Sequence, residues 1–202
     1  MMVHRKLLVL DLDETLIHAT EEESEHAPAF EYGTYSVHKR PHLEVFLQSA
    51  FAEFDVGIWT SAGADYAHYV VSRIMDPGDL KFLWASKRCT LRRDFTTGDY
   101  YPLKRLSKLK SLGYRLEHII AVDDSPEKHR ANYGNLIRVS EFTGDVDDAE
   151  LPRLLQYLRL LAAEPNVRRI EKRDWRLKIS NSPGSLNAQT SPSMAPSPRT
   201  SP

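Results

Sequence analysis

The chain has 202 residues, of which 41% are hydrophobic and 27% are charged, and its formal net charge is −1 at pH 7. This length and apolar content allow one folded domain with a buried core, and the balanced charge gives no indication of binding to nucleic acid or to a membrane surface. The single cysteine, Cys89, excludes an intrachain disulfide and a cysteine-rich metal site.

The first predicted element is a buried strand over residues 6–11, an apolar run that ends in Asp11. Asp11 and Asp13 interrupt the run and no small-residue cleavage site follows, so we expect a strand rather than a signal peptide. No other stretch is long and apolar enough to span a bilayer. These features predict an intracellular protein, cytoplasmic or, in a eukaryote, nuclear.

Strands and helices then alternate along the chain. Two short runs rich in aromatic and β-branched residues predict a hairpin over residues 30–37. Apolar residues at helical spacing follow Pro41, where a helix can start, and a second helix is predicted over residues 64–75. Between these helices, residues 56–60 have the composition of a buried strand.

The second half of the chain continues this pattern. Residues 82–85 predict a short strand, residues 89–103 a second hairpin, and residues 106–112 a basic helix. Buried strands are predicted at 118–122 and 136–139. A terminal amphipathic helix is predicted from the apolar stripe Leu151, Leu154, Leu155, Leu158 and Leu161.

This alternation predicts an α/β fold with a Rossmann-like, mostly parallel sheet and helices on both faces. In such sheets the chemistry gathers at the carboxyl ends of the strands, and here three strands end in Asp11, Thr60 and Asp123. We expect one domain over residues 1–178. Residues 179–202 are rich in serine and proline and predict a disordered tail.

Two carboxylates at the end of the first strand indicate phosphoryl transfer. Asp11 is positioned to act as nucleophile, and Asp13 to protonate the leaving group and then to activate water. Mg²⁺ prefers hard oxygen ligands, which Asp11, the backbone carbonyl of Asp13 and an acid from Asp123 and Asp124 could supply.

Three further residues fit the binding of a phosphate group. Thr60 and Ser61 could donate hydrogen bonds to phosphate oxygens, and Lys104 could neutralise the charge that the acids and the phosphate bring together. An acid pair alone could equally cap a helix or form a turn. The ordered set of Asp-x-Asp, Thr, Lys and Asp-Asp favours the catalytic interpretation.

These residues together resemble the motifs of a known family. The segment Asp11-Leu12-Asp13-Glu14-Thr15-Leu16 resembles the first motif of the haloacid dehalogenase superfamily. More narrowly, it is similar to the small carboxy-terminal-domain (CTD) phosphatases, also called the NLI-interacting-factor-like family. Supporting segments follow in order: Lys39-Arg40-Pro41-His42, Trp59-Thr60-Ser61-Ala62, Lys104 before Leu106-Ser107, and Asp123-Asp124-Ser125-Pro126.

The resemblance covers roughly residues 5–175 and implies a haloacid dehalogenase fold. It also implies magnesium-dependent hydrolysis of phosphoserine or phosphothreonine in proteins through an aspartyl-phosphate. The positions that it assigns are Asp11 as nucleophile, Asp13 as acid and base, Thr60 as phosphate-binding hydroxyl, Lys104 as neutralising lysine, and Asp124, beside Asp123, as metal ligand. It further implies a small three-stranded insertion between the second and third motifs, where the hairpin at 89–103 falls.

Three positions depart from the family pattern. Ser86 stands where the family often has arginine, the stretch from Cys89 to Lys104 looks longer than usual, and Arg105 replaces a common aspartate. The resemblance therefore implies the catalytic core but not recognition of an RNA polymerase II tail.

Several other residues are given structural interpretations. Cys89 does not fit a thiolate phosphatase, because Phe95 stands where that mechanism needs arginine. His129 is expected at the surface or at a helix end, and Tyr66 and Tyr69 in core packing.

Two alternatives to a protein phosphatase stay open: a small-metabolite phosphatase of the same fold, and a non-catalytic module that binds phosphorylated partners. The predicted partner is a phosphorylated protein or peptide. We expect no direct contact with nucleic acid or membrane, and a monomer.

Overall fold

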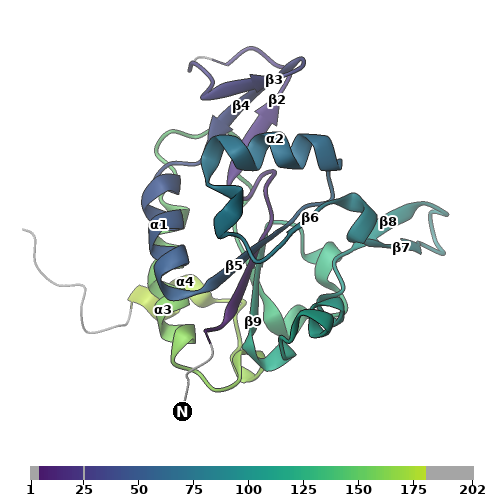
Figure 1. The fold of residues 1–202 in the computed structure, drawn as a ribbon, viewed down its shortest axis with the longest axis vertical. Coiled ribbons are helices and arrows are strands. Elements are labelled where there is room, and N and C mark those ends of the chain that lie inside the picture. The colour runs from purple at the N-terminus through teal and green to yellow at the C-terminus, as the bar shows by residue number, and fades with distance from the viewer. Residues whose placement is uncertain (1–4, 25, 181–202) are drawn as a thin grey trace, which may run out of the picture.

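The computed structural model describes residues 5–24 and 26–180 of the chain. Its centre is a sheet of five parallel strands (Figure 1). The order across the sheet is β10 (Leu136–Arg138), β9 (Ile119–Asp123), β1 (Leu7–Leu10), β5 (Asp55–Trp59) and β6 (Leu83–Trp84). The predicted α/β architecture is confirmed, because the four buried strands expected from the sequence and the short strand near residue 83 all belong to this sheet.

The central strand β1 explains why the sheet is buried on both sides. All four of its residues are apolar and buried. Successive side chains of a strand point to opposite faces. Leu8 and Leu10 therefore belong to one hydrophobic cluster, and Leu7 and Val9 to another.

Helices cover the two faces differently. The face of Leu8 and Leu10 packs against the four α-helices: α1 (Leu43–Glu53), α2 (Ala64–Ile74), α3 (Glu150–Ala162) and α4 (Trp175–Ser180). The opposite face packs against η3 (Leu106–Leu112), where the sequence predicted a basic helix. This segment is a 3₁₀ helix, and Leu106 and Leu109 align on its buried side because that helix has three residues per turn.

Shorter 3₁₀ turns make most of the remaining connections. Their bounds are η1 (Pro77–Asp79), η2 (Ser86–Arg88), η4 (Leu116–His118), η5 (Pro126–His129), η6 (Tyr133–Asn135) and η7 (Val167–Arg169). Helix α1 begins two residues after Pro41, because His42 adopts a left-handed conformation with φ of 66°.

Two small antiparallel sheets accompany the central one. The first has the order β2 (Ile17–Thr20), β4 (Tyr35–Lys39), β3 (Phe30–Tyr32), so the predicted hairpin at 30–37 is confirmed and gains a third strand. The second is the hairpin β7 (Thr90–Arg93) and β8 (Tyr100–Leu103), which projects from the domain in Figure 1.

The hairpin predicted at 89–103 is confirmed as β7 and β8, whereas the third strand that the resemblance implied for this insertion is not found there. The described chain has a two-stranded hairpin there, and its three-stranded sheet lies earlier, between β1 and α1. The reason is that residues 94–99, between β7 and β8, form the connecting turn and no further strand.

The described structure continues to the residues next to the predicted domain boundary at 178. Helix α4 reaches Ser180, and the predicted tail lies from residue 181 onward outside the described residues. Among the residues that the structure describes, no helix combines the length and the apolar character needed to cross a membrane.

Candidate active site

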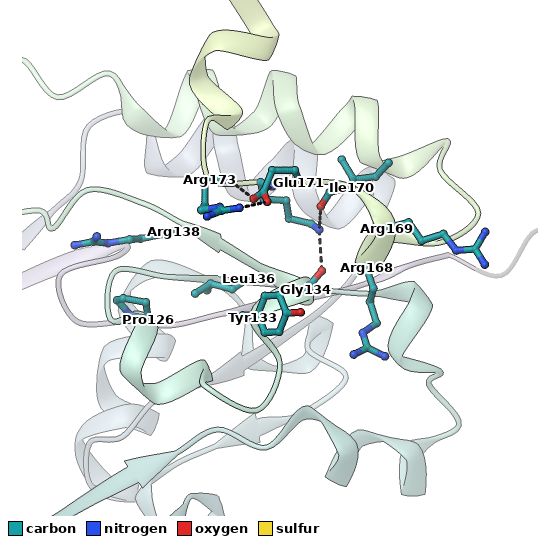
Figure 2. A pocket seen from close by; sticks show the side chains of 11 residues that line it. Pro126, Tyr133, Gly134, Leu136, Arg138, Arg168, Arg169, Ile170, Glu171 and Arg173 are labelled. Carbon is teal, nitrogen blue, oxygen red and sulfur yellow. Dashed lines mark hydrogen bonds and ion pairs between the residues drawn. The ribbon is translucent and has the colours of Figure 1, made fainter. Parts of the chain in front are cut away.

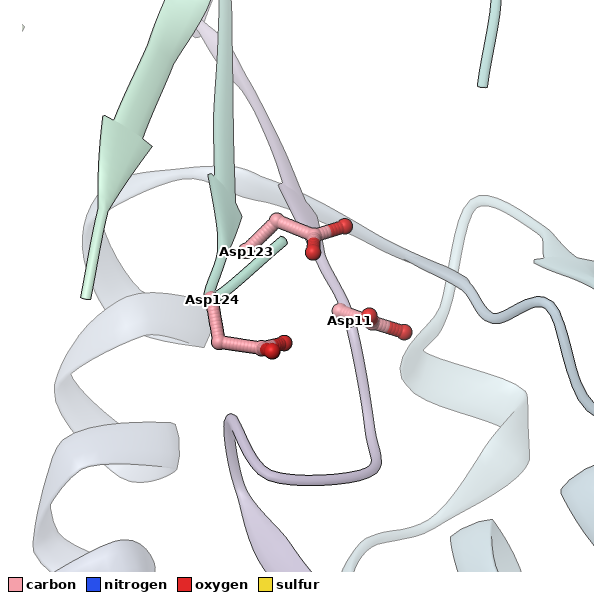
Figure 3. Close-up of side chains that lie close together, drawn as sticks. All are labelled: Asp11, Asp123 and Asp124. Atoms are coloured by element: carbon pink, nitrogen blue, oxygen red, sulfur yellow. The ribbon is translucent and has the colours of Figure 1, made fainter. Parts of the chain in front are cut away.

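The ends of three parallel strands bring the predicted acids and the threonine together. Asp11 follows β1, Thr60 follows β5, and Asp123 is the last residue of β9. Leu10 is in register with Ile58 on one side and Val122 on the other, so the three strands end at the same edge. Figure 3 shows Asp11, Asp123 and Asp124 gathered at this edge.

Lys104 lies between two of these carboxylates. Its Nζ is 2.8 Å from Oδ2 of Asp11 and 2.6 Å from Oδ2 of Asp123, and the lysine side chain is 1% exposed. A buried ammonium in this position offsets the repulsion between the two acids. Lys104 therefore lies between the two acids, at the position predicted for a neutralising charge.

A second lysine, Lys128, was not predicted. It lies in η5, and its Nζ is 3.3 Å from Oδ2 of Asp11 and 4.0 Å from Oδ1 of Asp123. The only sequence signal is Pro126, which starts a helical turn shortly after Asp124 and turns the following side chains back toward the strand end.

His129 lies at a helix end, as one of the two predicted positions, but it is buried rather than at the surface. It is the last residue of η5, and its Nε2 lies 3.0 Å from Oδ2 of Asp123. Asn132 holds the other side of the ring, with its Nδ2 3.2 Å from Nδ1 of His129. The histidine and the asparagine therefore fix the orientation of Asp123.

The pKa values of the two buried acids, Asp11 and Asp123, are shifted in opposite directions. Burial and the nearby charge of Asp123 raise the pKa of Asp11, against the attraction of Lys104 and Lys128. Burial would also raise the pKa of Asp123, but Lys104, His129 and Lys128 outweigh it and hold that pKa below its usual range. Asp123 therefore carries negative charge more readily than Asp11.

Asp13 is half-buried and held by two hydroxyl groups. Tyr66 in α2 donates a hydrogen bond of 2.5 Å to its Oδ1, and Thr60 donates one of 3.3 Å to its Oδ2. Burial and the adjacent Asp13 raise the pKa of Tyr66, so the phenol stays protonated and keeps donating. The prediction that Tyr66 only packs in the core was therefore incomplete. Ser61 follows Thr60 and is half-buried, and its role stays a prediction.

Asp11, Asp123 and Asp124 form a potential metal site. Each offers a carboxylate oxygen, and these oxygens lie within 4.8 Å of one another. Thr15 and Ser125 orient Asp124 through hydroxyl hydrogen bonds of 3.3 Å and 2.8 Å. A set of carboxylate oxygens is the donor type that Mg²⁺ prefers, so these residues fit the metal that the sequence predicted.

The sequence matches the family described as NLI interacting factor-like phosphatase over residues 6–168. The chain belongs to this family. Phosphatase Herzog of Drosophila melanogaster is 31% identical over 201 residues, which cover 96% of this chain and 52% of that protein. CTD nuclear envelope phosphatase 1 of Xenopus laevis is 30% identical over 189 residues, covering 85% of this chain and 73% of that protein. The chain thus spans about half the length of the Drosophila relative.

Solved structures confirm the haloacid dehalogenase-type fold. The fission yeast RNA polymerase II CTD phosphatase Fcp1 bound to beryllium fluoride has a TM-score of 0.53 at 22% identity, covering 72% of this chain and 44% of that chain. A haloacid dehalogenase-like family hydrolase from Xanthomonas campestris also has a TM-score of 0.53, at 13% identity, covering 80% of this chain and 98% of that chain. At these identities the similarity establishes the fold alone.

Proposed function

We propose that this chain is a magnesium-dependent phosphatase that hydrolyses phosphate monoesters through an aspartyl-phosphate on Asp11. The observation that carries the proposal is the cluster around Asp11. Lys104 and Lys128 lie 2.8 Å and 3.3 Å from its Oδ2, and Asp123 and Asp124 lie beside it. Phosphoryl transfer requires such a nucleophile within an array of positive charge.

In the first step the carboxylate of Asp11 attacks phosphorus, and the bond between phosphorus and the ester oxygen breaks. Asp13 donates its proton to the departing alkoxide. Lys104 and Lys128 offset the charge of the phosphoryl oxygens, and Thr60 and Ser61 donate hydrogen bonds to them. Bound Mg²⁺, held by Asp11, the Asp13 backbone carbonyl and Asp124 with Asp123 beside it, would screen the repulsion between carboxylate and phosphate.

In the second step Asp13, now ionised, takes a proton from water. The oxygen of that water attacks phosphorus, the bond to Asp11 breaks, and inorganic phosphate leaves with Asp11 restored. Tyr66 supports this role because its hydrogen bond holds the Asp13 carboxylate in one orientation while the Thr60 hydroxyl, which donates to Asp13 in the free chain, turns to the phosphoryl oxygens.

For the substrate we propose phosphoserine or phosphothreonine in a protein. The additions to the central sheet are small, namely the β2–β4–β3 sheet and the β7–β8 hairpin. Enzymes that act on small metabolites often close a large cap over the substrate, whereas a protein segment needs an open site. The names of the relatives support a CTD-type phosphatase, and we further propose a monomer in the cytoplasm or nucleus.

The experiment is hydrolysis of a generic aryl phosphate with and without Mg²⁺, by the native chain and by Asp11→Asn. Asp99→Asn, an exposed acid in the β7–β8 turn, is the matched control. We expect activity that requires both Mg²⁺ and Asp11 and that survives in the control. Turnover by folded Asp11→Asn would exclude the proposed nucleophile.

Substrate class is tested separately with phosphopeptides, sugar phosphates and nucleotides. A preference for phosphopeptides is expected. A preference for sugar phosphates or nucleotides would assign the chain to small metabolites, and phosphopeptide binding without turnover would assign it to phosphate-dependent recognition.

A further inference from the structure

A groove outside the active site has an unusual concentration of positive charge. It lies between the edge strand β10 and residues 167–173, and its volume is about 550 Å³ (Figure 2). We call it the basic groove and define it by its five cationic side chains: Arg138, Arg168, Arg169, Lys172 and Arg173. The formal charge of the whole chain is −1, so this concentration is local.

Most of this charge is not neutralised within the protein. The acidic side chain among the groove residues is Glu171, which pairs with Arg173 at 2.7 Å. Arg138, Arg168 and Arg169 are exposed, and their guanidinium groups form no ion pair within the described part of the chain. Figure 2 shows Arg138 at one end of the groove and Arg168 and Arg169 toward the other, with Arg168 also near Glu117, so the guanidinium groups offer separate contacts for carboxylate groups along the groove.

Lys172 is buried and holds the two sides of the groove in a fixed arrangement. The residue is 5% exposed, and its ammonium donates hydrogen bonds of 2.8 Å to the carbonyls of Gly134 and Ile170 and a further one to Val167. It therefore ties the two walls together. Its partners are carbonyl oxygens, so its charge adds to the positive potential of the groove.

The floor of the groove is apolar. Leu136 and Arg138 are two residues apart on β10 and so present their side chains to the same side. Leu136, Pro126 and the 82% exposed ring of Tyr133 provide a surface on which an apolar side chain can pack. A suitable ligand therefore combines negative charge with an apolar group.

We propose that the basic groove binds an acidic segment of a protein partner, with carboxylates on Arg138, Arg168 and Arg169 and an apolar side chain over Leu136 and Pro126. The charges lie at the two ends of one short groove with an apolar floor, which fits a short acidic segment with an apolar side chain, whereas binding along a nucleic acid backbone requires a longer track of positive charge. None of the groove residues belongs to the candidate active site, so the proposal is independent of the proposed phosphatase activity.

The test is fluorescence anisotropy with the full chain and a short labelled peptide in which glutamates flank two leucines, measured without Mg²⁺. Comparison peptides carry glutamine for glutamate, or serine for leucine. The variant Arg138→Glu/Arg168→Glu reverses two charges of the groove. Arg92→Glu/Arg93→Glu on β7 is the matched control, because both arginines are exposed and Arg92 lies near the basic residues Arg105 and Arg130.

We expect the groove variant to weaken binding of the acidic peptide by about tenfold or more, as loss of charge-assisted hydrogen bonds implies, and the control by less than about twofold. Both comparison peptides should bind more weakly than the parent. Equal losses in both variants, or no binding by the native chain, would overturn the proposal. Tighter binding of oligouridylate than of the peptide, lost in the groove variant, would assign the groove to nucleic acid instead.

Discussion

The hydroxyl of Tyr66 donates a 2.5 Å hydrogen bond to Oδ1 of Asp13 and links helix α2 to the loop that follows β1. The pKa of Tyr66 is raised by its burial and by the neighbouring carboxylate, so this donor stays protonated. Thr60 donates to the other oxygen of Asp13 over the longer distance of 3.3 Å. Tyr66 is therefore the closer of the two groups that position Asp13.

Replacement of Tyr66 by phenylalanine removes this hydrogen bond and keeps the ring. Loss of a hydrogen bond to a charged group is expected to lower kcat on an aryl phosphate by about tenfold to a hundredfold. KM should change little, because Asp13 acts on the leaving group rather than in binding. Tyr69→Phe on the same helix, whose ring packs on Phe30 and Tyr32, is the control and should keep full activity. Equal effects in both variants would indicate a packing role.

Lys128 provides a second prediction. Because it lies 3.3 Å from Asp11, Lys128→Met should lower kcat by about tenfold or more through loss of positive charge at the reacting phosphoryl group. Its side chain is 19% exposed and pairs with two buried carboxylates, so the variant should also unfold at a lower temperature, and activity is compared well below it. Lys108→Met is the control, since that lysine donates to the carbonyl of Arg88. Full activity of Lys128→Met would show that Lys104 alone is sufficient to neutralise the charge of the reacting phosphoryl group.

Metal binding is expected to depend on Asp124. Mg²⁺ should raise the unfolding temperature of the native chain, because a ligand at about a hundred times its Kd stabilises the folded state by about 2.7 kcal/mol. Asp124→Asn should reduce this shift, since it removes one charge from the three-carboxylate cluster. Asp79→Asn, an exposed acid in η1, should respond as the native chain does. An unchanged shift in Asp124→Asn would show that the charge of Asp124 does not contribute to metal binding, since the asparagine keeps an oxygen ligand.

The ion pair of Arg40 and Asp148 predicts a dependence of stability on pH. Arg40 is buried and forms bonds of 2.9 Å and 2.8 Å to Asp148, and it also donates to the carbonyl of Thr15. Burial opposes ionisation of Asp148, but the hydrogen bonds from Arg40 outweigh it and lower its pKa. The contribution to stability is therefore fully present above the unfolded pKa of about 4 and is lost as pH falls through the lower folded value.

Asp148→Asn should lower the free energy of unfolding at pH 7 by about 3 kcal/mol, because the buried Arg40 loses its partner. The variant should also show a smaller loss of stability than the native chain as pH decreases below about 4. Chemical unfolding at several pH values measures both effects. Asp147→Asn is the adjacent exposed control, and equal pH profiles for native chain and Asp148→Asn would contradict the assignment.

The sequence by itself determined the central architecture and where its acids lie. The apolar runs before Asp11 and Asp123 predict buried parallel strands, and parallel strands necessarily end at one edge of their sheet. The register of Leu10 with Ile58 and Val122 confirms this arrangement. Lys104 could also be placed, since it follows a hairpin in a segment that resembles the family.

The tertiary structure decided what surrounds those acids. Lys128 and His129 reach Asp11 and Asp123 because η5 folds back against β9. No periodic pattern in the sequence predicts this turn. Tyr66 reaches Asp13 because α2 crosses over the loop after β1. The basic groove joins β10 to residues 167–173, about thirty positions later in the chain. Local patterns record which side chains share a strand or helix face, whereas contacts between distant segments depend on how whole elements pack.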